Sequence, residues 1–208
     1  MLDASAERRR VIAAAALLLA PLVMLAADLV MWVGGEGAFW PWSVALWVSF
    51  FLYIPAILAL VHLLRPEGDR LGLLGGSLAL VGVMIGATIQ GVMRAQSVAI
   101  DRLGPSVAEM ISATYGEAPL LPTSISPGLT FPLGLVLLAI GVGRTGVGSL
   151  WTAAAVALGA ILFPVGRIGG LLEVSLLSDA LLLLGLGALG WRVWTRGAAW
   201  WQAPREPA

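Results

Sequence analysis

The sequence predicts an all-α, polytopic membrane helical bundle with six transmembrane helices. Of its 208 residues, 59% are hydrophobic and only 12% are charged, which is about half the charged fraction of a typical soluble domain. Long apolar runs follow one another along the chain, and a helix of about twenty such residues crosses the hydrocarbon core of a bilayer. Neither a linker nor an internal duplication divides the chain, so we expect residues 1–208 to form a single transmembrane domain.

The six predicted helices are the apolar segments between short polar breaks. They lie near residues 11–33, 42–64, 71–93, 125–143, 147–165 and 171–194. Pro21, Pro55 and Pro132 fall inside helices, which a membrane bundle tolerates because neighbouring helices satisfy the freed carbonyl groups. The basic and then apolar start resembles a secretory signal peptide, but the apolar run continues past Asp28 to Val33, which favours a retained helix.

Arginine sets the predicted orientation, because cytoplasmic segments of membrane proteins carry an excess of basic residues. The chain contains no lysine, and most of its arginines fall on the same side as the N-terminus when the six helices alternate in direction. The arginines on that side are Arg8, Arg9, Arg10, Arg65, Arg70, Arg144, Arg192, Arg196 and Arg205, whereas Arg94, Arg102 and Arg167 lie on the other side. We therefore expect both termini to be cytoplasmic.

One outer connection, residues 94–124, is longer than the others and contains the sequence GPSVAEMISATYGEAP. Its apolar residues Val107, Met110 and Ile111 recur at helical spacing, and acidic residues occupy other faces. This pattern predicts a short amphipathic helix near residues 105–116 that lies on the outer membrane surface. The alternatives are a solvated connector and a lid over an outer cavity.

Several chemistries are excluded because the residues they need are absent from the sequence. The chain has no cysteine for disulfides or thiolate ligands, and no lysine for a Schiff base. Its single histidine, His62, cannot build a haem or zinc site by itself. No basic tract is present to bind nucleic acid. We therefore expect no metal and no cofactor, and the partner that the composition indicates is the lipid bilayer.

The strongly polar residues inside the predicted helices fall in their outer halves, apart from His62. They are Asp28, Gln90, Arg94, Ser126, Thr130, Arg167, Glu173 and Asp179. Because they come from five separate segments, we expect them to meet in a polar pocket that opens to the outside.

Asp179 lies deepest of these residues. It is eight residues inside the last helix, about 12 Å at 1.5 Å per residue, where an unpaired carboxylate costs about 2.5–3.5 kcal/mol. We therefore expect Asp179 to face the bundle and to pair with Arg94 or Arg167. Arg94 is the preferred partner, because a stripe of small residues turns one face of the third helix toward its neighbours. Glu173 is expected nearer the mouth of the pocket.

Three classes of function fit these features. The first is a protein that binds or transports a small molecule or lipid through Arg94, Gln90, Arg167, Glu173 and Asp179. The second is an intramembrane enzyme that uses Asp179, together with Asp28, for acid–base chemistry on an apolar lipid or isoprenoid. The third is a structural or regulatory subunit of a membrane complex. Either a second copy of the chain or another membrane subunit could be its protein partner.

The segment FPLGLVLLAIGVGRTGVGSLWTAAAVALGAILFPVGRIG, residues 131–169, resembles the C-terminal half of small multi-pass bacterial membrane proteins of unknown function. The similarity covers about a fifth of the chain and consists of Gly, Pro and Leu positions. It implies a location in the bacterial inner membrane, and it implies neither an activity nor any residue roles.

Overall fold

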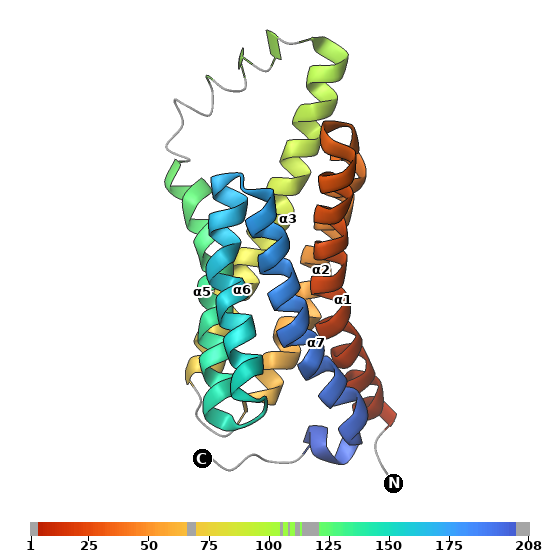
Figure 1. Ribbon diagram of the computed structural model, residues 1–208, viewed down its shortest axis with the longest axis vertical. Helices are drawn as coiled ribbons and strands as arrows, with labels where there is room; N and C mark the ends of the chain where they lie inside the picture. Colours follow the sequence, from red (N-terminus) through yellow and green to blue (C-terminus); the bar gives the residue numbers. More distant parts are fainter. Residues whose placement is uncertain are drawn as a thin grey trace.

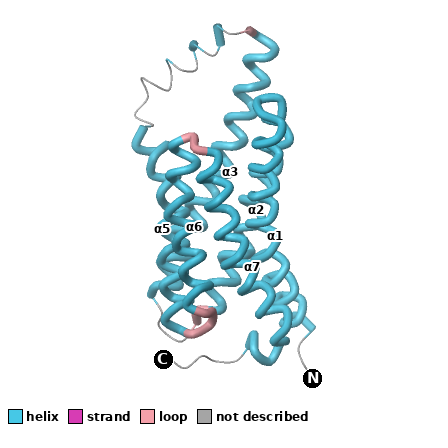
Figure 2. The backbone as a smooth tube through the Cα atoms, viewed as in Figure 1, coloured by secondary structure: helices cyan, strands magenta, loops and turns pink. Residues whose placement is uncertain are grey.

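The computed structural model describes residues 4–65, 70–104, 106, 107, 109, 110, 113 and 121–202, without the side chains of residues 36 and 121–128. Within these residues the chain is helical and contains no strand, as the sequence predicts (Figures 1 and 2). The elements are α1 (Ala4–Gly34), η1 (Gly35–Ala38), α2 (Phe39–Leu63), α3 (Arg70–Leu103), α5 (Leu121–Thr145), α6 (Leu150–Gly169) and α7 (Leu172–Gln202).

Five of these helices are long and apolar enough to cross a membrane, which indicates a multi-pass membrane protein. They are α1, α2, α3, α6 and α7. In α5 the apolar part whose side chains are described, Leu129–Thr145, is shorter.

The helices form a closed ring in the order of the chain. Each helix packs against the next, from α1 through α2, α3, α5 and α6 to α7, and α7 then packs against α1. Because the six α-helices alternate in direction, α1 begins and α7 ends at the same end of the bundle (Figure 1). The side chains that fill the ring include Met24, Tyr53, Phe131 and Leu182, all of them fully buried.

Glycines allow the helices of the ring to approach closely. A Cβ atom on Gly82 of α3 would lie 2.6 Å from the Cα atom of Phe131 on α5 and closer still to its amide nitrogen, and one on Gly75 would lie 2.9 Å from the carbonyl oxygen of Gly134. A Cβ atom on Gly86, farther along the same stripe, would lie 2.7 Å from the ring of Phe50 on α2. The small-residue stripe of α3 therefore faces protein, as predicted.

The third helix is longer than predicted. We expected it to end near residue 93, but it continues to Leu103 and extends beyond the ends of α6 and α7 (Figure 1). The residues after Arg94 contain neither Gly nor Pro until Gly104, whose φ of +92° ends the helix. The predicted surface helix near residues 105–116 lies mostly outside the described residues.

The last helix also continues beyond its predicted end at Trp194. Gly197, with a φ of +76°, bends α7 so that its final turns cross the end of the bundle. There Trp201 is buried and stacks on the ring of His62, with 4.2 Å between the ring centroids. His62 thus takes part in helix packing at the end of the bundle that holds both termini.

Candidate functional site

The candidate site lies at the other end of the bundle, where α6 turns into α7. Gly170 ends α6 in the left-handed conformation with a φ of +67°, so α7 returns along α6. Gly166 makes the close return possible, because a Cβ atom there would lie 2.6 Å from the amide nitrogen of Ser175. This turn brings Arg167, in the last turn of α6, beside Asp179 of α7.

Asp28 reaches the same point from α1. It belongs to the buried stripe of that helix, one helical turn beyond Met24, and the stripe faces α7 and α2. The closed ring therefore brings together two acids and one arginine from three helices. The side chains of Asp28 and Asp179 are fully buried, and that of Arg167 is 17% exposed.

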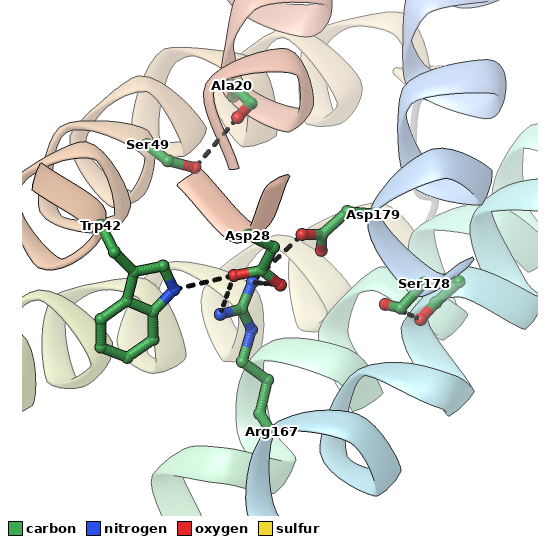
Figure 3. Close-up of polar contacts among 8 residues, drawn as sticks. Ala20, Asp28, Trp42, Ser49, Arg167, Ser178 and Asp179 are labelled. Atoms are coloured by element: carbon green, nitrogen blue, oxygen red, sulfur yellow. Dashed lines mark hydrogen bonds and ion pairs between the residues drawn. The ribbon is translucent and has the colours of Figure 1, made fainter. Parts of the chain in front are cut away.

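The guanidinium group of Arg167 contacts both carboxylates (Figure 3). Its Nη1 donates to Oδ1 of Asp28 at 3.0 Å, and its Nη2 lies 3.0 Å from Oδ2 of the same residue, in ion-pair contact. Nη2 also donates to Oδ2 of Asp179 at 3.1 Å. Charge-assisted contacts with two carboxylates hold an arginine in one orientation. We refer to Asp28, Arg167 and Asp179 as the acid–arginine cluster.

Trp42 of α2 completes the surroundings of Asp28. Its indole Nε1 donates a hydrogen bond of 2.9 Å to Oδ1 of Asp28, on the side of the carboxylate away from Asp179 (Figure 3). Asp28 therefore receives hydrogen bonds from an indole and a guanidinium, which offset the cost of removing a carboxylate from water.

Some buried polar atoms around the cluster have no hydrogen-bond partner among the described residues. They are Oδ2 of Asp28, Oδ1 of Asp179, Nε of Arg167, the hydroxyl of Tyr53 and Oε1 of Gln90. Buried polar atoms are usually paired with protein, water or a ligand. This part of the bundle is thus equipped to make further hydrogen bonds.

A cavity of about 560 Å³ lies beside the acid–arginine cluster. Asp28, Arg167, Trp42, Gln90 and Ser175 supply the polar part of its wall. The remaining wall is apolar and consists mainly of Met31, Phe50, Ile89, Met93, Phe131, Phe163, Ile168 and Leu172. Met93, Ile168 and Leu172 lie where the wall approaches the surface of this end of the bundle. A largely apolar cavity with a few convergent polar groups is typical of a small-molecule site.

Aromatic rings line the inner part of the cavity. Phe131 of α5 makes edge-on contacts with Phe50 of α2 and Phe163 of α6, at centroid distances of 6.3 and 5.1 Å. Tyr53 makes a third edge-on contact with Phe131 at 5.0 Å. The guanidinium group of Arg167 lies 5.4 Å from the ring centroid of Phe163. The charged cluster and the aromatic rings are therefore parts of one continuous wall.

The structure brings together some of the predicted site residues and separates others. Gln90, Arg167 and Asp28 line the cavity, and Asp179 lies behind Arg167, in contact with it. Arg94 and Glu173 are not among the lining residues, and Glu173 is exposed.

The preference for Arg94 as the partner of Asp179 is wrong, because the partner is Arg167. Arg94 instead lies 4.8 Å from the ring centroid of Trp47 on α2, and its Nε donates to the carbonyl oxygen of Gln90 at 3.4 Å. Arg94 does not end α3 but lies within it, where the helix passes Trp47 of α2. Arg94 therefore faces α2 rather than the centre of the ring.

Sequence reasoning missed Trp42 and the three phenylalanines of the wall. The position of Trp42 offered a signal, because it follows α1 by a short connection and lies in the first turn of α2, at the same end as Asp28. The phenylalanines gave no separate signal, because an isolated aromatic residue in an apolar segment looks like any other core residue.

The indole of Trp42 gives a direct test of this geometry. Trp42→Phe should lower the free energy of unfolding by about 1.5–3 kcal/mol, because it removes a hydrogen bond to a buried carboxylate. The matched control is Trp40→Phe on the exposed side of the same helix, which should change stability by less than about 0.5 kcal/mol. Equal effects of the two substitutions, measured by denaturant unfolding in detergent, would contradict the assigned contact.

Comparison with protein-family models, with curated proteins and with solved structures gives no match for this chain.

Proposed function

We propose that this chain is a six-span membrane protein whose outward-facing pocket binds an amphiphilic small molecule or lipid. The observation that carries the proposal is the cavity of about 560 Å³ with a largely apolar wall and one polar cluster. Ligand sites typically have volumes of about 300–1,000 Å³ and a few polar groups that orient the ligand. An amphiphile matches this wall, with its apolar body against the phenylalanines and its polar group toward Asp28 and Arg167.

In this proposal α5 is the sixth span, and both termini lie on the cytoplasmic side of a bacterial inner membrane. Exposed tryptophans near the two ends of the bundle support a membrane position, since tryptophan is enriched where a membrane meets water. They are Trp32 and Trp40 at the end that holds the cavity, and Trp151, Trp191 and Trp194 at the other end. The excess of arginine at the end that holds both termini supports the cytoplasmic assignment.

Cysteine labelling tests this orientation, because the natural chain contains no cysteine. In intact bacterial cells or spheroplasts, Leu103→Cys should react with a membrane-impermeant maleimide. Ser149→Cys should react only after the membrane is permeabilised. Both positions are exposed and lie at opposite ends of the bundle. The reverse pattern of labelling would overturn the orientation.

Binding is favoured over acid–base catalysis because of how the acids are held. Asp179, the stronger candidate for catalysis, lies behind Arg167 and not in the cavity wall. Asp28 does line the cavity, but both of its oxygens contact Arg167 and one also accepts from Trp42. A carboxylate held by such contacts is suited to orienting a bound group.

The pocket can be tested with the neutral lipophilic dye Nile red. Native mass spectrometry of the purified protein, released from nanodiscs, should count one retained dye molecule per chain. Ile89→Trp adds bulk to the cavity wall, so the retained dye should fall at least tenfold.

The control for this experiment is Met84→Trp on the same helix, at a position that is exposed and does not line the cavity. This variant should retain the dye. Equal retention by the two variants, or no retention by the unmodified chain, would overturn the proposed pocket.

A further inference from the structure

The acid–arginine cluster contains more negative than positive charge. With both carboxylates ionised, two negative charges face one guanidinium group, and both acids are fully buried. Excess charge away from water is costly unless a proton neutralises it or an opposite charge comes close to it. The cluster is therefore incomplete in electrostatic terms and favours one additional positive charge.

No other described cation supplies that charge. Within the part of the chain that the structure describes, Arg167 is the only cation in salt-bridge contact with Asp28 or Asp179. Arg94, the next arginine at this end of the bundle, lies against Trp47. The exposed Glu173, on the first turn of α7, adds negative charge near the mouth. A cation that enters the cavity thus meets a favourable electrostatic field.

The cavity wall can also hold a cation by its aromatic rings. Phe50, Phe131, Phe163 and Trp42 all line it, and Asp28 lies in the same wall. The face of an aromatic ring attracts a positive charge, and most strongly where water is excluded. The arginine of the cluster already uses this interaction, since its guanidinium group lies over Phe163.

We infer that the ligand of this pocket is an organic monocation with an apolar body, such as a lipophilic amine or quaternary ammonium compound. The inference rests on the proposed pocket and specifies its ligand class. The positive group lies toward Asp28 and balances the second carboxylate of the cluster, while the apolar body lies against the phenylalanines.

The test compares two probes of almost the same shape and opposite charge, tetraphenylphosphonium and tetraphenylborate. Binding of each to the protein in nanodiscs, corrected for partition into empty nanodiscs, should be at least tenfold tighter for the cation. Asp28→Asn should weaken the binding of tetraphenylphosphonium at least tenfold. Asp179→Asn removes the same charge without changing the cavity wall, and it should also weaken the binding of tetraphenylphosphonium. This variant replaces Asp28→Asn in the test if Asp28→Asn fails to fold.

Two controls separate this inference from the proposed function. Glu173→Gln removes one acid at the same end of the protein but outside the cavity wall, and it should change the affinity less than threefold. Nile red should bind Asp179→Asn and Glu173→Gln, neither of which changes the cavity wall, as it binds the unmodified chain.

The results with Nile red and with the charged probes distinguish the pocket from its ligand class. If Nile red binds but the two charged probes bind equally, or if both asparagine variants keep their full affinity for tetraphenylphosphonium, the pocket stands and the cationic ligand class is overturned. The second of these results would mean that a proton already balances the cluster. If neither Nile red nor the charged probes bind, the proposed pocket itself is overturned.

Discussion

Arg167→Gln should lower the free energy of unfolding by about 3–5 kcal/mol, the usual cost of leaving a buried charge without its partner. The effect is expected at the upper end of this range, because one guanidinium group serves two fully buried carboxylates. Glutamine has a similar length and can donate one hydrogen bond, but it supplies no charge. Unfolding of the detergent-solubilised protein by a denaturant titration would measure the loss.

A double-mutant comparison shows whether the loss comes from the carboxylates. Asp179→Asn alone should stay within about 1 kcal/mol of the unmodified protein, since the ion pair of Arg167 with Asp28 remains. Combined with Arg167→Gln it should recover part of the stability, because only one uncompensated acid is left. Strictly additive effects, or a loss below about 1 kcal/mol for Arg167→Gln, would mean that the cluster is accessible to water.

Gly82→Ala should destabilise the bundle by about 1–3 kcal/mol through overpacking. The added methyl group would overlap the backbone of Phe131, which cannot move without separating α3 from α5. Because Phe131 also contacts Phe50 and Phe163, the substitution should disturb the aromatic wall of the cavity. Thermal unfolding would measure the stability, and retention of Nile red would report on the cavity.

Gly91→Ala is the matched control on the same helix. A Cβ atom at Gly91 would have no atom within 4 Å, so this substitution should be neutral, or stabilising by up to about 1 kcal/mol because alanine favours a helix. If Gly82→Ala were tolerated as well as Gly91→Ala, the close approach of α3 and α5 would be wrong.

The sequence predicts those features that follow from local patterns. Apolar runs locate the helices, and the small residues of α3 identify a packed face, because both signals repeat within one helix. Asp28 and Asp179 could be identified as inward-facing residues from their depth alone, since a lone acid is too costly on the lipid side.

The features that sequence reasoning missed depend on how helices pair in space. Asp179 pairs with Arg167 and not with Arg94 because of the close α6–α7 turn at Gly166 and because Arg94 packs against Trp47 of α2. The residues around the two arginines in the sequence show neither of these contacts. The same holds for Trp42, which reaches Asp28 only because α2 packs beside α1. Residue type and depth limit which residues can belong to the site. The packing of the helices in the ring decides which of these residues come into contact.

The closed ring also has a consequence for synthesis of the protein. Asp28 is translated 139 residues before Arg167, so α1 enters the bilayer while its acid has no counterion. Only when the last two helices arrive does α7 pack against α1, and only then does Arg167 of α6 give Asp28 its guanidinium partner. A nascent chain that stops before α6 therefore has both an open ring and an unpaired acid, and a single late step of assembly removes both defects.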